Sequence, residues 1–451
     1  MTDMKPISAD RLDAIVKAYD IRGTVPDQLD AEMCRTFGAA FARFCEAPEI
    51  VVAHDMRPDG VEFSAAFAEG AMSQGVDVIE IGLASTDMLY FASGHLDMPG
   101  AVFTASHNPA GYNGLKLCGP KAKPVGMESG LADVRALAEQ GLDATGQGSS
   151  RSMDLLSAFA DHVRSFIDVG SLRPLKIVAD TGNGMGGHVA PAAFEGLPID
   201  IEIMYGELDG TFPNHPADPL QAENLVDLQA RVLEVGADVG LAFDGDADRV
   251  FLVDENAKTV SGSLTTALVA KAMLEATGPG PIIHNLICSK ATVEVIEENG
   301  GEPVRTKVGH SFIKAVMAET GAAFGGEHSG HYYFRDNWRA DSGLIAAMIV
   351  LEQMSLSGQT LSEMLAPLDR YIASGEINTV VDDAAAVIER VSEAYAGHSQ
   401  DRLDGLTVQF DDWWFNLRSS NTEPLLRLNL EAPTAAEVEH RVAEVKGHFS
   451  A

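Results

Sequence analysis

The amino-acid sequence predicts an α/β protein made of three related mixed-sheet α/β domains and a C-terminal α+β domain. At 451 residues the chain is too long for one hydrophobic core, so three or four domains are expected. One arrangement occurs three times: a short apolar strand ending in Phe103, Phe243 or Phe324 runs directly into a polar loop. After Pro367 the pattern changes to strands joined by short connections, which is typical of an antiparallel sheet.

The first α/β domain is predicted over residues 1–150. Apolar residues recur every three or four positions from Leu29 to Phe44, which predicts an amphipathic helix. The continuous run from Glu49 to Asp55 is typical of a strand buried on both faces. Another helix is expected over 63–72, and further strands over 76–81 and 100–103. This alternation of strands and helices predicts a mainly parallel sheet.

A Gly/Ser-rich stretch at 145–152 (TGQGSSRS) is interpreted as a linker, after which the same pattern restarts twice. The second α/β domain is predicted over 151–254, the third over 255–367 and the α+β domain over 368–451. The strands expected in the second and third domains are 176–180, 199–204, 240–243, 249–253, 281–287, 304–308 and 321–324, with a helix over 291–298. The last domain is expected to hold strands over 376–381, 406–410, 413–418 and 425–430 and helices over 384–395 and 435–449.

Composition limits the partners that the protein can bind. A net charge of −34 argues against a nucleic-acid-binding surface, but a local cationic pocket can still take an anionic small substrate. The longest apolar run, Ile345 to Leu351, is far short of a membrane span, and the first ten residues show no secretion signal. The four scattered cysteines are typical of reduced thiols. We therefore expect a cytoplasmic protein with neither nucleic-acid nor membrane partners.

The strongest chemical signal is the spacing of Asp244, Asp246 and Asp248 directly after a strand. Carboxylates this close raise one another's pKa unless a cation intervenes, and Mg²⁺ is the default hard cation for oxygen ligands. Glu255 at the twelfth position imitates a calcium-binding EF-hand loop, but Arg249 stands at the sixth position, where that loop needs glycine. A solvated acidic turn is the other alternative.

Ser106 follows the buried-looking strand 100–103 and lies between Thr104 and Pro109, at a strand end where open α/β sheets bind ligands. It is either a nucleophile or an ordinary turn residue, and no G-x-S-x-G elbow supports hydrolase-type activation. Aligning the three phenylalanines places Ser106, Asp246 and Glu327 at one equivalent position. Neighbours on an extended chain point apart, so direct pairing of Ser106 with His107 is not expected.

Two further loops combine groups that suit a sugar phosphate. Arg418 to Pro424 supplies hydroxyls, an amide, backbone N–H groups and an arginine, which form either a phosphate cradle or a polar hairpin turn. Glu327, Ser329 and His331 suit sugar hydroxyls, with capping of the following segment as the structural alternative. Thr181 to Gly184 lacks the lysine of a phosphate-binding P-loop and is interpreted as a structural turn.

In their order along the chain, these motifs resemble the α-D-phosphohexomutase superfamily, and most of all its bacterial phosphomannomutase/phosphoglucomutase group. The resemblance covers essentially the whole chain, from Tyr19-Asp20-Ile21-Arg22-Gly23 through 104–109, 244–249 and 326–331 to 418–424. It implies four domains around a central cleft, the last of them TATA-binding-protein-like. Two positions depart from the family pattern: His328 stands where methionine is common, and Lys290 lies slightly after the expected lysine.

The resemblance also implies the roles of individual residues. Ser106 would be the phosphoserine, and its oxygen would complete a Mg²⁺ site made by Asp244, Asp246 and Asp248. Transfer would proceed through a hexose 1,6-bisphosphate, which also serves as the activator. The implied catalytic residues are Ser106, His107, Lys116, Arg249, His331 and Arg22, and the implied substrate-binding residues are Tyr19, His310, Glu327, Ser329, Arg418, Ser420, Asn421 and Thr422.

The expected activity is the interconversion of hexose 1-phosphate and hexose 6-phosphate, with mannose or glucose as the sugar. Phosphoglucosamine mutase activity, a metal-dependent phosphatase and a non-catalytic sugar-phosphate-binding regulator are the alternatives. The expected partners are small sugar phosphates, and the chain is expected to be a monomer or a dimer.

Overall fold

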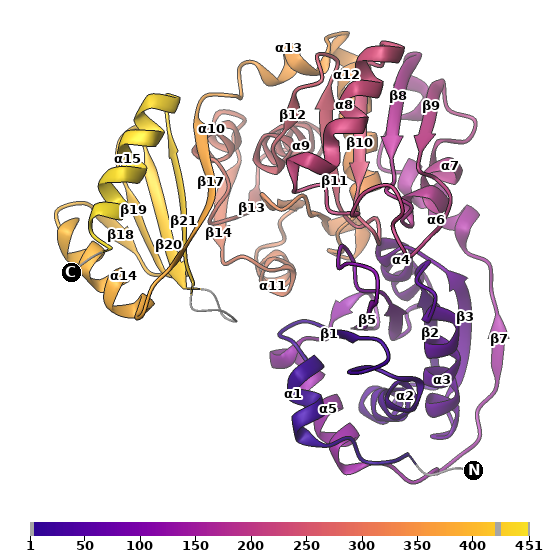
Figure 1. The fold of residues 1–451 in the computed structure, drawn as a ribbon. Coiled ribbons are helices and arrows are strands. Elements are labelled where there is room, and N and C mark those ends of the chain that lie inside the picture. The colour runs from indigo at the N-terminus through magenta and orange to yellow at the C-terminus, as the bar shows by residue number, and fades with distance from the viewer. Residues whose placement is uncertain (1–3, 420–424, 450–451) are drawn as a thin grey trace. The chain divides into compact units, whose positions relative to one another are not determined.

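The computed structural model describes residues 4–419 and 425–449, and for residue 310 the backbone alone. The chain divides into two compact units. The first consists of residues up to Val260 together with His331–Leu361, and the second of Ser261–Gly330 and the residues from Ser362 onward. Figure 1 shows the course of the chain with its helices and strands labelled.

The first sheet is mixed and has the strand order β1-β5-β4-β2-β3-β7. These strands are β1 (Ile21–Thr24), β5 (Tyr112–Gly119), β4 (Gly100–Phe103), β2 (Glu49–His54), β3 (Asp77–Leu83) and β7 (Ser150–Ser152), and the short β6 (Lys123–Pro124) pairs with β5. Strands β4, β2, β3 and β7 are parallel, and β5 is antiparallel to its two neighbours. The linker interpretation of 145–152 is therefore wrong for its last residues, because they hydrogen-bond to the edge strand β3 as β7.

Helices pack on this sheet and bury its central strands β2 and β4. They are α1 (Ala9–Ile15), α2 (Ala31–Cys45), α3 (Gly60–Met72), α4 (Thr86–Leu96) and α5 (Leu131–Gln140). The fully buried rings of Phe37, Phe41, Phe67 and Phe103 belong to one hydrophobic core. Helices α2 and α3 approach so closely that a Cβ at Gly70 would lie 1.9 Å from a backbone oxygen of α2, which leaves glycine as the only residue that fits.

The second sheet has the order β12-β11-β10-β8-β9. Its strands are β8 (Leu175–Asp180), β9 (Ile199–Met204), β10 (Val239–Phe243), β11 (Val250–Asp254) and β12 (Thr259–Val260), and its helices are α6 (Leu156–Arg164), α7 (Gly186–Phe194) and α8 (Val226–Val235). Strands β8, β9 and β10 are parallel, whereas β11 returns antiparallel to β10. The turn between β10 and β11 carries the aspartates.

The segment His331–Leu361 belongs to the first unit and contains β16 (Tyr332–Phe334) and α12 (Gly343–Ser357). Ser342 caps α12 by accepting a hydrogen bond from the amide of Ile345. A Cβ at Gly343 would lie 2.7 Å from the backbone of Arg249, so the start of α12 touches the acidic turn directly. Among the described residues no helix is both long and apolar enough to pass through a membrane.

The second unit begins with a parallel sheet in which β13 (Pro281–Asn285) pairs with β14 (Glu302–Thr306) on one side and β15 (Phe324–Gly326) on the other. Its helices are α9 (Gly262–Thr277), α10 (Lys290–Glu298) and α11 (His310–Thr320). The third polar loop, which starts at Glu327, follows β15. The three phenylalanine-ended strands of the sequence are thus real strands, each at the same point in its own sheet.

The C-terminal domain is an antiparallel sheet with the order β17-β21-β20-β19-β18. The strands are β17 (Ile372–Val380), β18 (Ser399–Asp401), β19 (Leu406–Gln409), β20 (Trp414–Ser419) and β21 (Leu425–Ala432), and the helices are α14 (Ala384–Ala394) and α15 (Ala435–Gly447). The short helix α13 (Leu361–Leu365) precedes this domain. Helices α14 and α15 and one face of the sheet share a single hydrophobic core (Figure 1). The predicted α+β class of this domain is confirmed.

Candidate active site

Ser106 lies in the loop after β4 and is 4% exposed. Its hydroxyl donates to Asp244 Oδ2 at 3.0 Å, which joins the first sheet's loop to the second sheet's acidic turn. The backbone of Ser106 has φ +49°, a left-handed conformation that places its Oγ 3.2 Å from His107 Nδ1. The expectation that these neighbours point apart is wrong because the chain is not extended here.

The acidic turn brings Asp244, Asp246 and Asp248 together, all at most 2% exposed. One oxygen from each carboxylate lies within 4.8 Å of the others. Asp246 Oδ1 and Asp248 Oδ1 are buried, and neither has a hydrogen-bond partner among the described residues. Buried oxygens left in this way suit a hard divalent cation. The EF-hand alternative is wrong, because strands β10 and β11 flank the turn where helices would be needed.

Two cationic side chains offset part of the carboxylate charge. Lys116 Nζ, on β5, donates to Asp246 Oδ2 at 2.7 Å and to Asp248 Oδ2 at 2.8 Å. Arg249 donates from Nε to Asp244 Oδ2 at 2.9 Å and from its backbone amide to Asp244 Oδ1 at 3.1 Å. Three carboxylates therefore face two fixed positive charges, which leaves a net negative site.

The pKa values follow from burial and these charges. Burial raises the pKa of Asp244 well above its usual range, and the neighbouring carboxylates add to this against the charge of Arg249. Burial also acts to raise the pKa of Asp246, but the ammonium group of Lys116 outweighs it and holds that pKa below its usual range. Burial acts to lower the pKa of Lys116, and Asp246 and Asp248 more than reverse this, so the lysine stays charged.

His107 is a neutral imidazole in this structure. Burial, Arg249 and Arg22 lower its pKa to about 2. Arg249 Nη2 donates to His107 Nδ1 at 2.7 Å, and because a guanidinium cannot accept, Nδ1 is the unprotonated nitrogen. Arg22, on β1, reaches the same loop through a 2.5 Å hydrogen bond to Asn108 Oδ1 and pairs with Asp20 at 2.7 Å. Tyr19 is half-buried just before β1.

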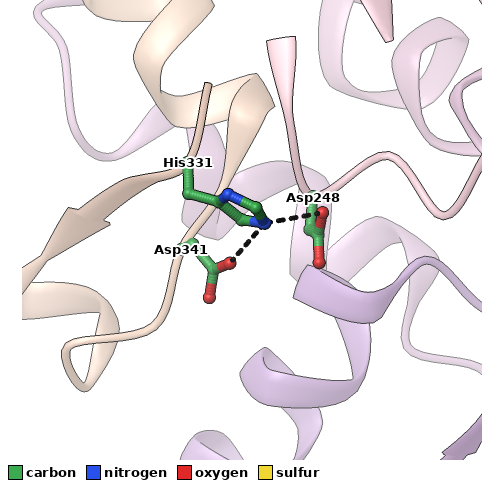
Figure 2. A group of neighbouring side chains, drawn as sticks. All are labelled: Asp248, His331 and Asp341. Atoms are coloured by element: carbon green, nitrogen blue, oxygen red, sulfur yellow. Dashed lines mark ion pairs between the residues drawn. The ribbon is translucent and has the colours of Figure 1, made fainter. Parts of the chain in front are cut away.

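His331 is the first residue of the second stretch of chain in the first unit, and it lies next to the acidic turn. Its backbone forms a bridge with Arg249, and its ring stacks against Tyr333 with centroids 6.2 Å apart. Figure 2 shows His331 Nε2 directed at two carboxylates, 3.8 Å from Asp248 Oδ1 and 4.0 Å from Asp341 Oδ2. Asp341 was not identified from the sequence, where it is only the residue before the cap of an apolar helix.

Two more buried residues of the site carry no recognisable sequence signal. Thr86, at the start of α4, donates from its amide to Asp246 O at 3.1 Å and from Oγ1 to Asp246 Oδ2 at 2.6 Å. Asp87 accepts hydrogen bonds from Ser85 and from Ser342 Oγ, the latter at 2.7 Å. Burial raises the pKa of Asp87 to about 7 despite these hydrogen bonds, and the charges of Asp248 and Asp341 act in the same direction.

The sugar-binding candidates lie in the second unit. Glu327 is 2% exposed, and its Oε1 accepts from Asn285 Nδ2 and from the amide of Gly309, each at 3.1 Å. Ser329 is half-buried two residues further on. His328 Nδ1 lies 2.9 Å from Ser263 Oγ, so the histidine that departs from the family pattern is fixed by a side-chain hydrogen bond.

Arg418, on β20, pairs with Glu376 Oε2 at 2.6 Å and is 8% exposed. The backbone amide of Lys290 donates to Glu431 Oε2 at 2.8 Å, and its ammonium group donates to the carbonyl of Asp411. Lys290 thus bonds to the C-terminal domain. The side chain of His310 and the residues Ser420, Asn421 and Thr422 lie outside the described residues.

Four family models match the chain in sequence. They are described as phosphoglucomutase/phosphomannomutase alpha/beta/alpha domain I over residues 13–141, domain II over 157–258, domain III over 261–371 and the C-terminal domain over 376–448.

Individual proteins agree with these models. A phosphomannomutase of Salmonella montevideo is 42% identical over 92% of this chain and 94% of its own length. A protein named phosphohexose mutases from Xanthomonas campestris is 40% identical over 95% and 97%. Among solved structures, a phosphoglucomutase/phosphomannomutase family protein of Burkholderia thailandensis is 31% identical, with a TM-score of 0.88 over 98% of this chain and 97% of that one. A Paramecium phosphoglucomutase with 15% identity and a TM-score of 0.80 shares the fold.

Proposed function

Because this chain belongs to the phosphoglucomutase/phosphomannomutase family and is a phosphohexose mutase, we propose that Ser106 carries the phosphoryl group that it transfers. The substrates are mannose 1-phosphate or glucose 1-phosphate and the corresponding 6-phosphates. The observation that supports this best is the 3.0 Å hydrogen bond from Ser106 Oγ to Asp244 Oδ2, beside two unpaired carboxylate oxygens. Phosphoryl transfer requires an oxygen that carries the phosphoryl group and a cation site next to it, and Ser106 and the aspartates supply these two.

The proposed metal is Mg²⁺, held by Asp244, Asp246, Asp248 and an oxygen of phospho-Ser106. Asp246 Oδ1 and Asp248 Oδ1 fit such an ion, because they are buried and have no hydrogen-bond partner among the described residues. When bound, Mg²⁺ neutralises charge on the phosphoryl oxygens and on the serine oxygen. Lys116 already pairs with Oδ2 of Asp246 and Asp248, so these two carboxylates keep an ordered geometry before the cation arrives.

In the proposed transfer step, a sugar hydroxyl attacks the phosphorus of phospho-Ser106 and the bond from phosphorus to Oγ breaks. His331 takes the proton of the attacking hydroxyl, since its Nε2 faces the acidic turn. Lys116 and Arg249 stabilise the charge on the transferring group, and Arg22 and neutral His107 hold the loop that presents it. The product is a hexose 1,6-bisphosphate, which is also the activator that restores the phosphoserine.

The second half-reaction returns the other phosphate of the bisphosphate to Ser106, and the proton goes back to the departing sugar oxygen. For this the sugar must bind in two orientations. We assign Glu327 and Ser329 to the hydroxyls at C3 and C4, which glucose and mannose share. We also assign Tyr19 and His310 to substrate binding. The phosphate that is not reacting is held by Arg418, Ser420, Asn421 and Thr422, whose hydroxyl and amide groups suit either orientation.

Several broader predictions remain part of this proposal. The proposed domain boundaries are 1–150, 151–254, 255–367 and 368–451, with β7 pairing across the first boundary to the first sheet and β12 across the second boundary to the second sheet. The protein is proposed to be cytoplasmic and a monomer or a dimer. Phosphoglucosamine mutase activity is the alternative. Comparing kcat/KM for mannose, glucose and glucosamine phosphates decides among the sugars.

The deciding experiment is Ser106→Ala, assayed with mannose 1-phosphate or glucose 1-phosphate, Mg²⁺ and a hexose 1,6-bisphosphate. We expect loss of activity, together with loss of the phosphate that intact-mass analysis detects on the wild-type protein. Full activity in the variant would refute the proposal. A metal-dependent phosphatase would release inorganic phosphate instead of isomerising the ester, and a non-catalytic regulator would do neither.

A further inference from the structure

We infer that Asp55 and Arg57 form a buried clamp on the backbone of the serine loop, and that phosphoryl transfer depends on this clamp. The inference rests on the proposed function, in which Ser106 carries the phosphoryl group. Both residues follow β2 and act on the backbone around Ser106 rather than on its hydroxyl. They are therefore positioning residues.

Arg57 is 3% exposed, and its guanidinium group hydrogen-bonds to backbone carbonyls of one loop. Nη2 donates to the carbonyl oxygens of Ser106 at 2.9 Å and Asn108 at 2.7 Å. Nη1 donates to those of Pro109 at 3.1 Å and Tyr112 at 2.8 Å. Four carbonyls of one loop thus converge on one side chain. Only the planar fork of arginine offers enough donors in a fixed plane to do this.

Asp55 is fully buried and holds Arg57 in place. Its Oδ1 accepts from the amide of Arg57 at 2.9 Å, and its Oδ2 lies 3.3 Å from Arg57 Nε. Its own amide donates to the carbonyl of Phe103 at 2.8 Å, at the end of β4 where the serine loop begins. The carboxylate therefore orients the guanidinium, and the backbone amide of Asp55 holds the segment after β2 against the end of β4. From the other side of the guanidinium, the ring of Phe212 lies 5.2 Å away.

The clamp is needed because Ser106 adopts a left-handed backbone. A φ of +49° is unfavourable for serine and persists only where the surroundings impose it. Arg57 fixes the carbonyl side of Ser106, and Thr104 Oγ1 fixes the other side by accepting from the Ser106 amide at 3.0 Å. This conformation directs Oγ to Asp244. Loss of the clamp frees the loop to relax to an ordinary turn with the hydroxyl directed elsewhere.

A purely structural role for Arg57 is the competing explanation, and the chain offers a matched control. Arg164, on α6, also donates to three backbone carbonyls, those of Ala192 at 2.5 Å, Ala193 at 2.9 Å and Glu195 at 3.0 Å. It secures the end of α7 and has no bond to the serine loop. Arg164→Met removes a comparable set of hydrogen bonds from the same unit without disturbing Ser106.

The experiment compares Arg57→Met, Arg57→Lys and Arg164→Met with wild-type protein loaded with Mg²⁺. We expect lower melting temperatures for Arg57→Met and Arg164→Met, but a loss in kcat of about 10²-fold, with KM little changed, only for Arg57→Met. Arg57→Lys restores the charge without the fork and stays closer to Arg57→Met than to wild type. Equal kcat in Arg57→Met and Arg164→Met would overturn the inference.

A second readout separates positioning from folding. Protein phosphorylated on Ser106 is mixed with sugar phosphate, and transfer to the sugar is compared with release of inorganic phosphate to water. We expect Arg57→Met to lower the ratio of transfer to release, and an unchanged ratio would count against the clamp. If Arg57→Met does not fold, Asp55→Asn, which keeps the shape of the side chain, is measured in its place. Wild-type protein without phosphate on Ser106 would instead refute the proposed function itself.

Discussion

The ammonium group of Lys116 lies 2.7 Å from Asp246 Oδ2, and this contact ties the first sheet to the acidic turn of the second. Lys116 comes from the antiparallel strand β5, and Asp246 from the turn that follows β10. The pair is nearly closed to solvent, so its attraction is little screened. Without a metal, Lys116 and Arg249 together offset the charge of the three carboxylates.

Lys116→Met is predicted to change metal binding and turnover in opposite directions. The variant loses a charge that stabilises the transferring phosphoryl group, so kcat should fall by about 10²- to 10³-fold. It also leaves the aspartates more negative, so Mg²⁺ should bind more tightly. Titration calorimetry and steady-state kinetics measure the two effects. Lys121→Met, at an exposed ion pair with Asp97, is the control and should change neither. Weaker Mg²⁺ binding in Lys116→Met would contradict this account.

Metal binding is predicted to stabilise the first unit. A cation that binds only the folded state contributes about 2.7 kcal/mol at a concentration 100 times its Kd. The unfolding midpoint should therefore rise with Mg²⁺ and return to its starting value with EDTA. In Asp246→Asn this response should largely disappear, whereas Asp161→Asn, at an exposed carboxylate, should respond like wild type. A midpoint that is insensitive to Mg²⁺ in the wild-type protein would argue against a metal site here.

Stability is predicted to depend on the protonation of Asp87. Its pKa is about 7 in the folded protein and 3.8 for the unperturbed group, so between these values the folded state holds a proton that the unfolded state has lost. Stability from this group is therefore present below about pH 4 and decreases toward pH 7, by about 1.4 kcal/mol per unit. Asp87→Asn removes this loss, so its stability relative to wild type should increase from pH 4 to pH 7. A difference that is constant with pH would show that Asp87 does not titrate in this way.

Gly245 is predicted to admit no side chain. A Cβ there would lie 2.4 Å from the carbonyl oxygen of Ser106. This oxygen cannot move away easily, because Arg57 donates a hydrogen bond to it. Gly245→Ala should therefore push the acidic turn away from the serine, lower kcat by about 10²-fold and weaken Mg²⁺ binding. Gly280→Ala, where a Cβ meets nothing within 4 Å, serves as the control. Kinetics and calorimetry on the two variants test this, and similar behaviour of both would show that the contact is tolerated.

The sequence was sufficient for those parts of the site that lie within one short segment. Asp244, Asp246 and Asp248 are three positions of one turn, so their spacing alone indicated a cation site. The strand before each polar loop was visible because a parallel strand buried on both faces is a continuous apolar run. The four-domain α/β and α+β architecture followed from the same patterns, and it is confirmed.

What the sequence did not reveal depends on contacts between distant segments. Thr86 and Asp341 are ordinary residues around the start of a helix until the fold places them against the acidic turn. Arg57 lies 49 positions from Ser106, and no periodicity connects the two. The closeness of Ser106 Oγ to His107 Nδ1 was missed for a local reason, because a left-handed serine cannot be deduced from its neighbours alone.

The two pieces of chain that form the first unit have a consequence for the synthesis of the protein. Helix α12 packs against that unit, but it is translated only after the whole stretch Ser261–Gly330, which belongs to the other unit. At about 5–20 residues per second, the ribosome therefore releases the two sheets of the first unit well before the helix that completes them. During this interval the apolar surface that α12 later covers is open, so nascent chains stopped before residue 361 should be the ones that chaperones retain.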